Sequence, residues 1–348
     1  MVASTKYQDK YVDYLLLDLE RNIKKNPSTI YIGGGTPSSL SLDNLNRLFN
    51  KIKNLVNLEN ILEYTIEVNP EDINLDLIEC LKTSNVSRIS LGIQTFNPRL
   101  QKVINRYCDF DDIKQKIDLL KKHGFHNINV DLMYGIGDET LVEVLEDLNK
   151  MLLLRPTHIS TYSLILEEKT ILYYQYQKGL FKLCDPDLES TMYYEIVKVL
   201  KNQGFNHYEI SNFALPNHES LHNLIYWNNE EYFGIGAGSS GYYEGLRYKV
   251  NPKIEDYYHA LEYNGSLYVD EELIDDDTKM WEELMLGLRK IEGVSIIDFR
   301  KKYKKEIFMV FPNINLLTKQ GFLEVKNNYL RITDNNYYIS NSILTKLM

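Results

Sequence analysis

The stretch that decides the fold is residues 29–37, which read TIYIGGGTP. Residues 29–32 are β-prone and predict a short strand, and the next helix is predicted over residues 41–52. The three glycines between them let backbone N–H groups approach a ligand without interference from a Cβ atom. Thr36 adds a hydroxyl, and Pro37 fixes the exit of the turn. A tight strand-to-helix turn would also use glycines, so ligand binding and plain turn geometry both remain open for this loop.

The same strand–helix unit recurs along the first two-thirds of the chain. At least five strands are predicted before Leu166, each followed by a helical pattern, which indicates a parallel sheet with right-handed crossovers and helices outside it. We therefore expect an α/β fold, a full or partial TIM-barrel-like (β/α) barrel with its site at the C-terminal ends of the strands, and a doubly wound sheet is the alternative. The strands are predicted over 29–32, 64–68, 88–91, 128–132 and 158–162, and the helices over 7–22, 41–52, 75–82, 111–123, 140–154 and 188–203.

The composition and the hydrophobic pattern of the sequence change after residue 205. Residues 206–249 carry short aromatic segments and many glycines, which predicts irregular β structure over one edge of the barrel. Helices are then predicted over 278–288, 295–303 and 313–320, followed by strands over 322–325 and 330–333, an order that resembles a small winged-helix domain. We expect three parts: a partial barrel over 1–205, an irregular β and aromatic segment over 206–269, and a winged-helix-like domain over 270–348.

The composition excludes several classes of protein. A chain of 348 residues with 44% hydrophobic residues can bury a large core. The net charge of −10 argues against a nucleic-acid partner, because phosphate binding needs a positive field. No apolar run approaches the ~20 residues needed to span a bilayer, and the first residues do not form a secretory signal. We therefore expect a cytoplasmic protein without stable membrane insertion, and the sequence does not define its oligomeric state.

Polar residues stand at the ends of the predicted strands. Glu67 ends the second strand, Gln94 follows the third with Arg106 on the helix beyond it, and Asp131 ends the fourth. A carboxylate suits ribose hydroxyls or an ammonium group, Gln94 suits a carboxylate or a hydroxyl, and Arg106 suits a carboxylate. Each could be an ordinary loop residue by itself. Because barrel strands end at one rim, we expect these side chains to face a shared cavity.

A second candidate site lies in HNLIYW, residues 222–227. A neutral imidazole such as that of His222 is a good axial ligand for iron. Tyr226 and Trp227 offer flat apolar surface to a porphyrin, and Asn223 could orient the imidazole or reach a propionate. A buried histidine in an aromatic cluster is the alternative. We expect this segment to pack elsewhere on the same body, away from the strand tips.

The motifs in order resemble the radical S-adenosylmethionine (SAM) proteins of the oxygen-independent coproporphyrinogen III oxidase family. They are GGGTP at 33–37, EVNP at 67–70, GIQTF at 92–96 and NVDLMYG at 129–135, and the resemblance runs over nearly the whole chain. It implies a radical SAM-type barrel that binds SAM. The residues that it implies for SAM are Gly34, Gly35 and Thr36 at the methionine part, Glu67, Gln94, Arg106 and Asp131 at the amino-acid and ribose ends, and Ile165 near the adenine.

HYEISNFA at 207–214 and HNLIYW at 222–227 are similar to the heme-chaperone branch of this family. The resemblance implies a protein that binds heme and delivers it to heme-accepting respiratory proteins. His222 is then the expected heme-iron ligand, with Asn223, Tyr226 and Trp227 beside the heme. The alternative from another class is an oxygen-independent coproporphyrinogen III oxidase, a radical SAM oxidoreductase, against which HNxxYW counts. A structural member whose GGGTP loop binds nothing is a third possibility.

The chain departs from the family at its metal ligands. The family holds a [4Fe–4S] cluster with Cys-x3-Cys-x2-Cys in a loop after the first barrel strand, whereas Cys80, Cys108 and Cys184 here have no metal-ligand spacing. We expect the parent gene to encode about 20 more residues with that strand and loop. The chain as given should then bind no cluster and have no catalytic residues, and residues 29–32 should be an unpaired sheet edge.

A second departure lies in the turn after the aspartate strand. The family pattern G-x-P-x-Q-T reads GIGDET at residues 135–140, so proline and glutamine are both replaced. We expect the local turn and the start of the next helix to differ from the family.

Overall fold

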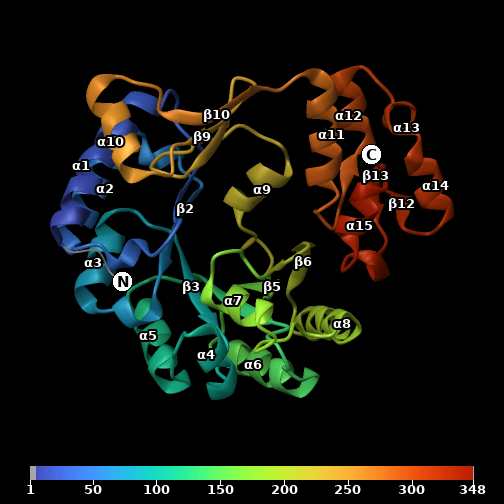
Figure 1. Ribbon diagram of the computed structural model, residues 1–348, viewed down its shortest axis with the longest axis horizontal. Coiled ribbons are helices and arrows are strands. Elements are labelled where there is room, and N and C mark those ends of the chain that lie inside the picture. Colours follow the sequence, from blue (N-terminus) through green and yellow to red (C-terminus); the bar gives the residue numbers. More distant parts are fainter. Residues whose placement is uncertain (1–4, 348) are drawn as a thin grey trace.

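The computed structural model describes residues 5–347, and its main body is a curled half-barrel of seven strands (Figure 1). The first five strands run parallel, β7 is antiparallel to β5, and β6 is antiparallel to β7. The predicted strands and their parallel pairing are confirmed. In spatial order the strands are β1 (Thr29–Ile32), β2 (Glu63–Val68), β3 (Arg88–Gln94), β4 (Asn127–Tyr134), β5 (His158–Ser163), β7 (Asn212–Ala214) and β6 (Asn206–Glu209).

Amphipathic helices pack against the outer face of this sheet. Their apolar stripes and the outward residues of the strands form one buried core, which includes Leu45 and Leu148 from helices and Ile66 and Val130 from strands. The helix predictions are confirmed to within three residues at each end. The helices of this half of the chain are α1 (Thr5–Asn22), α2 (Leu42–Leu55), α3 (Leu75–Thr83), α4 (Pro98–Ile104), α5 (Phe110–Lys122), α6 (Leu141–Leu153), α7 (Ile171–Gln177) and α8 (Pro186–Asn202), with short 3-10 turns at Pro37–Ser39, Leu58–Asn60 and Pro70–Asp72.

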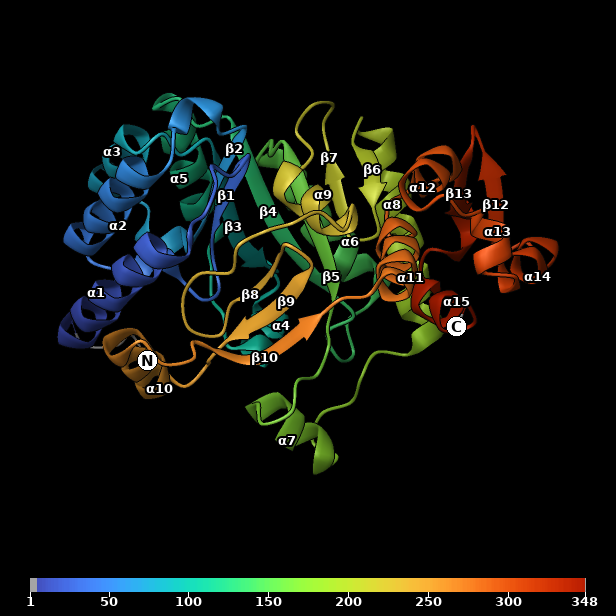
Figure 2. The same ribbon diagram turned by 90° about the horizontal axis from the view of Figure 1, so that it is seen from above.

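The remaining chain forms two smaller sheets and further helices. One sheet has the order β10-β9-β8 and the other the order β11-β13-β12. Figure 2 places the second of these, with its helices, at the opposite end of the molecule from α1 and α2. The elements are α9 (Leu221–Trp227), β8 (Ser240–Tyr243), β9 (Leu246–Val250), α10 (Ile254–Tyr263), β10 (Tyr268–Leu273), α11 (Asp276–Gly287), β11 (Val294–Ser295), α12 (Ile296–Tyr303), α13 (Ile307–Val310), α14 (Asn313–Lys319), β12 (Leu323–Lys326), β13 (Tyr329–Ile332), a 3-10 turn (Asp334–Asn336) and α15 (Ser340–Thr345).

One expectation for this part is confirmed only in part. Residues 206–249 do contain the short strands β6, β7, β8 and most of β9, but Leu221–Trp227 form the helix α9. The Ser220 side chain accepts a hydrogen bond from the backbone of Asn223 and caps the helix at its first turn.

Two further observations concern the sheet edge and the bilayer. Among residues 5–347, β1 pairs only with β2, so it is an edge strand of the described sheet, as expected. None of the helices described is both long and apolar enough to cross a membrane.

Candidate functional site

The concave face of the half-barrel is lined by polar side chains. Side chains alternate between the two faces of a strand, so the strand registers put one polar set inward and the apolar set outward. Asn129 ties three strands together, since it is hydrogen-bonded to Ser90 on β3 and to His158 on β5. The inward residues include Thr29, Tyr31, Glu63, Thr65, Glu67, Arg88, Ser90, Asn129, Asp131, His158, Ser160 and Tyr162.

The glycine loop after β1 lies directly above Glu67. A Cβ atom at Gly33 would come within 2.6 Å of the Glu67 carboxylate and 2.5 Å of the Tyr31 ring, so only glycine fits there. Gly34 has a φ of +83°, and a Cβ atom there or at Gly35 would meet no described heavy atom within 4 Å. The Tyr31 hydroxyl donates a hydrogen bond of 2.7 Å to Glu67. The loop therefore forms an open backbone cradle beside a carboxylate.

Gln94 and Arg106 fold together over Gly92 at the end of β3. A Cβ atom at Gly92 would lie 3.1 Å from the Arg106 guanidinium and 3.3 Å from the Gln94 amide. Arg106 donates a hydrogen bond of 2.8 Å to Asn69, which follows β2. Gln94 has a φ of +74°, and its buried Oε1 has no hydrogen-bond partner among the described residues. The backbone of Gln94 is thus held in the left-handed region, and its side-chain amide has an unused acceptor oxygen that can accept a hydrogen bond from a ligand.

Asp131 lies on the neighbouring strand, opposite Gly92. Burial raises the pKa of its carboxyl to about 6, against the lowering effect of hydrogen bonds from Asn129 and Ser160. The structure therefore brings Glu67, Gln94 and Asp131 to adjacent strand ends, and Arg106 reaches them over Gly92 from the loop after α4, not from a helix as predicted. Ile165 lies in the loop after β5 and is 79% exposed.

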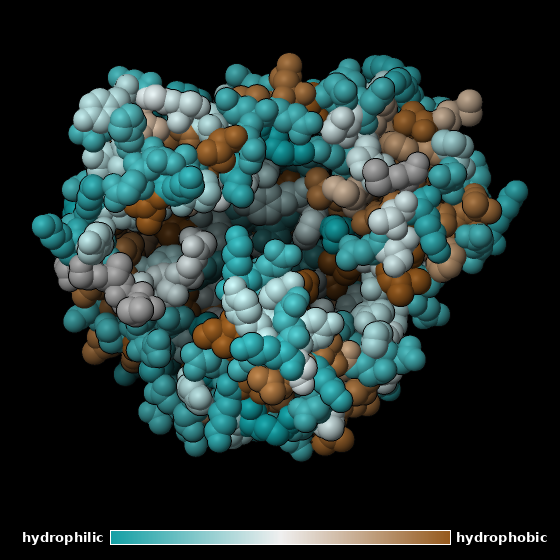
Figure 3. Space-filling model, in the orientation of Figure 1, coloured by the Kyte–Doolittle hydropathy of each residue, from teal (hydrophilic) through white to brown (hydrophobic). Residues whose placement is uncertain are grey.

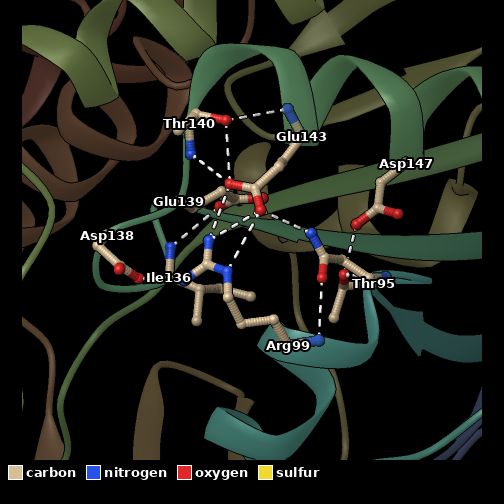
Figure 4. Close-up of polar contacts among 9 residues, drawn as sticks. Thr95, Arg99, Ile136, Asp138, Glu139, Thr140, Glu143 and Asp147 are labelled. Atoms are coloured by element: carbon tan, nitrogen blue, oxygen red, sulfur yellow. Dashed lines mark hydrogen bonds and ion pairs between the residues drawn. The ribbon is translucent and has the colours of Figure 1, made fainter.

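The loops after β3 and β4 are joined by a polar cluster, drawn in Figure 4. Arg99 forms ion pairs with Asp138 and Glu143, and Glu143 forms a capping box with Thr140 at the start of α6. Glu139 stands where the family has glutamine, and its carboxylate accepts a hydrogen bond from the backbone of Ile136. The altered turn therefore still leads into a well-capped helix.

Glu139 is fully buried, and its Oε1 has no hydrogen-bond partner within residues 5–347. Burial raises the pKa of its carboxyl to about 7. Because the unfolded chain releases this proton at lower pH, the folded state loses stability as the pH rises from about 4.5 through 7.

We expect Glu139→Gln to stabilise the protein by about 3 kcal/mol at pH 8 and to have little effect at pH 4.5, since glutamine keeps the acceptor and does not ionise. Urea unfolding at both pH values measures this difference. Glu146→Gln, at an exposed position of α6, is the matched control. An equal effect of Glu139→Gln at both pH values would show that Glu139 does not titrate in this way.

The helix that carries HNxxYW packs into the concave face, with its N-terminus on Glu63. This buried carboxylate accepts hydrogen bonds from the Ser220 hydroxyl and from the backbone N–H groups of Leu221 and His222, at 3.2, 2.9 and 3.3 Å. A carboxylate is stabilised by the unsatisfied N–H groups at a helix N-terminus. Glu63 and Thr29 are the first residues of β2 and β1, so α9 packs at the starts of these strands, away from their C-terminal tips as expected, but on the same concave face. Figure 3 shows the surface hollowed in the region where Figure 1 draws β2 and α9.

His222 makes contacts through both ring nitrogens and one ring face. Nδ1 lies 2.8 Å from the Thr29 hydroxyl, and Nε2 lies 2.8 Å from the Tyr226 hydroxyl. The ring stacks on Tyr31 with centroids 5.2 Å apart. Burial lowers the pKa of His222 to about 4, so the imidazole is neutral near pH 7, the form that binds iron. Thr29 is placed to orient the ring, and Tyr226 occupies the nitrogen that a metal would need.

We expect Tyr226→Phe to tighten heme binding by about fivefold, since removing the hydroxyl frees Nε2 of one hydrogen bond worth about 1 kcal/mol. Spectroscopic titration with hemin measures the change. Tyr232→Phe is the control, because Tyr232 packs edge-on against Tyr226 without touching the imidazole nitrogens. Weaker binding by Tyr226→Phe would show that the hydroxyl serves the heme complex.

The other two residues of the HNxxYW motif, Asn223 and Trp227, do not contact the His222 ring in the way that Tyr226 does. Trp227, at the far end of α9, lies 5.8 Å from the Arg289 guanidinium and lines a pocket of about 320 Å³ with Lys290 and Val294. Asn223 is half-buried, and its backbone N–H caps onto Ser220. The structure thus places His222 and Tyr226 together and puts Trp227 on the side of the C-terminal region.

Sequence reasoning missed most residues of this face, among them Thr29, Tyr31, Glu63 and Arg88. The signal was present, because Thr29 and Tyr31 occupy the inward phase of a strand, as Glu63 and Glu67 do on the next. A polar residue at every second position of a strand indicates that one face of the sheet is polar.

The donor set does not fit an iron–sulfur cluster. Cys80 lies in α3, Cys108 between α4 and α5, and Cys184 before α8, and burial raises the pKa of all three thiols. Within residues 5–347 no three His, Cys, Asp or Glu side chains gather as metal ligands.

Comparison of the sequence and fold with those of known proteins identifies the family of the chain. Residues 3–151 match the radical SAM superfamily, and residues 274–338 match the HemN C-terminal domain. The heme chaperone HemW of Lactococcus lactis is 39% identical over 98% of this chain and 89% of its own length. HemW of Bacillus subtilis is 35% identical over 96% of this chain and 90% of its own length. The radical SAM enzyme coproporphyrinogen III oxidase (HemN) of Escherichia coli has the same fold, with a TM-score of 0.85 at 20% identity over 99% of this chain and 84% of its own.

Proposed function

This chain belongs to the HemW family of radical SAM heme chaperones, and from that membership we propose that it binds heme and delivers it to respiratory proteins. The observation that carries the proposal is the neutral imidazole of His222, held on the polar concave face by Thr29 and stacked on Tyr31. A histidine whose second nitrogen is fixed by a neighbour is the usual form of an axial iron ligand. Tyr226 supplies an aromatic surface beside it.

We also propose that the rim of strand ends binds SAM. The glycine loop offers backbone N–H groups, and Glu67, Gln94, Arg106 and Asp131 offer groups of the kinds that an amino acid and ribose require. Ile165 would border the adenine from the loop after β5. In radical SAM proteins a [4Fe–4S] cluster bound with SAM supplies radical chemistry, but the cysteines described here do not form its ligand set.

The finer architecture is part of the proposal. We divide the chain into a radical SAM-like partial barrel over 1–205, a segment with HNxxYW over 206–269 and a winged-helix-like domain over 270–348. The sheet order β11-β13-β12 with helices before and between its strands supports the last of these. We propose a cytoplasmic location without stable membrane insertion.

A hemin titration followed in the Soret region tests the proposed function. We expect saturable binding of heme by the isolated chain at neutral pH, with the spectrum of histidine-ligated iron. A linear, unsaturable response equal to that of an unrelated protein would refute it. Turnover of coproporphyrinogen III would instead support the oxidase, which the fold alone also accommodates.

A further inference from the structure

One charged side chain on the concave face has no partner. Arg88, the first residue of β3, is 2% exposed. Its Nε is enclosed and has no hydrogen-bond partner within residues 5–347. A guanidinium removed from water costs free energy unless a carboxylate or carbonyl replaces the lost hydration. Arg88 therefore lacks an anionic or strongly accepting partner.

The carboxylates on the same face are occupied elsewhere. Glu63 accepts the hydrogen bonds at the N-terminus of α9, Glu67 accepts the Tyr31 hydroxyl, and Asp131 accepts the amide of Asn129. Burial raises the pKa of the Asp131 carboxyl, and the charge of Arg88 is among the causes that lower it, after the hydrogen bonds. The three carboxylates are thus engaged with other donors, and the Nε of Arg88 has no acceptor among the described residues.

Arg88 lies on the same concave face as the two candidate ligand regions, at the start of β3. Its register partners are Thr65 on β2 and Asn127 on β4, so it lies deeper in the half-barrel than the strand-end residues. After burial, its charge is among the causes that lower the pKa of His158 and of His222. Tyr31, on which the His222 ring stacks, pairs with Thr65, and Thr65 pairs with Arg88, so Arg88 stands level with the His222 site on the same face.

We propose that Arg88 binds a carboxylate of the bound ligand. Its planar guanidinium donates two parallel hydrogen bonds to a carboxylate, a geometry that lysine cannot reproduce. The inference rests on the proposed function, in which two molecules carry carboxylates: heme through its propionates and SAM through its methionine end. The test therefore separates these two sources.

The experiment compares free acids with esters. Protoporphyrin IX, which has no iron and does not need His222, and its dimethyl ester are titrated by fluorescence into wild type, Arg88→Met and Arg88→Lys. We expect Arg88→Met to weaken binding of the free acid by about 10- to 100-fold and to leave binding of the ester unchanged. Arg88→Lys should bind the free acid with an affinity between those of wild type and Arg88→Met. Arg300→Met, at an exposed position of α12, is the matched control, and circular dichroism checks that each variant is folded.

A parallel calorimetric titration with SAM identifies the source of the carboxylate. Weaker SAM binding with unchanged porphyrin binding would assign Arg88 to the methionine carboxylate. If Arg88→Met weakens binding of the acid and the ester equally, or weakens binding of no ligand, the proposal is overturned. Ordered water would then be the partner of Arg88. If Arg88→Met weakens binding of the free acid but His222→Ala leaves the Soret spectrum of bound heme unchanged, only the assignment of His222 as iron ligand fails. If His222→Ala removes the histidine-ligated spectrum but Arg88→Met affects the acid and the ester equally, only the Arg88 proposal fails.

Discussion

Replacing His222 with alanine is expected to weaken heme binding by at least about 100-fold and to remove the Soret features of histidine-ligated iron. The imidazole of His222 has the right donor atom, the right neutral form and a neighbour that fixes its ring, and it is partly exposed, whereas His158 on the same face is fully buried. Alanine removes this proposed iron ligand and leaves the Tyr31 stacking face open. Hemin titration of the two proteins measures the loss.

The matched control is His259→Ala. His259 is an exposed histidine beside Tyr263 on α10, so it shares the residue type and an aromatic neighbour but not the concave face. We expect its replacement to leave heme affinity unchanged. Equal affinities for wild type and His222→Ala, with both folded, would remove His222 from the site.

Replacing Glu63 with alanine is expected to lower the free energy of unfolding by about 3 to 5 kcal/mol, because three donors at the start of α9 lose their buried acceptor. Heme affinity should fall with it, since α9 carries His222. Urea unfolding and hemin titration of the same variant measure both effects.

Two further variants sharpen this prediction. Glu63→Gln keeps an acceptor without the charge, so its loss of stability should be smaller. Glu59→Ala, at an exposed position in the turn before β2, should be close to neutral. A loss below about 1 kcal/mol in Glu63→Ala would mean that the α9 contact contributes little to the fold.

The sequence predicted the half-barrel well because each of its units is local. A strand over 29–32, the glycine loop and a helix capped by Ser41 are all encoded within a few residues, and the structure has them there. Parallel order also follows from the chain, since each strand is followed by a helix. Glu67, Gln94 and Asp131 could be placed on one rim for the same reason.

The position of HNxxYW could not be predicted because its contacts are distant along the chain. The hydrogen bond between Thr29 and His222 joins residues 193 apart, and the one between Glu63 and Ser220 joins residues 157 apart. No local pattern encodes such a pair. The alternation of polar residues in β1 and β2, which sequence reasoning did not use, would have indicated a polar face but not which segment covers it.

The most direct test of the central account is a nitrogen hyperfine measurement on the ferric heme complex. Protein labelled with ¹⁵N only in histidine is loaded with hemin and studied by electron–nuclear double resonance. We predict a strongly coupled histidine nitrogen in the wild type that disappears in His222→Ala and persists in His259→Ala. A coupling that survives unchanged in His222→Ala, or its absence from the wild type, would contradict the assignment of this imidazole as the iron ligand.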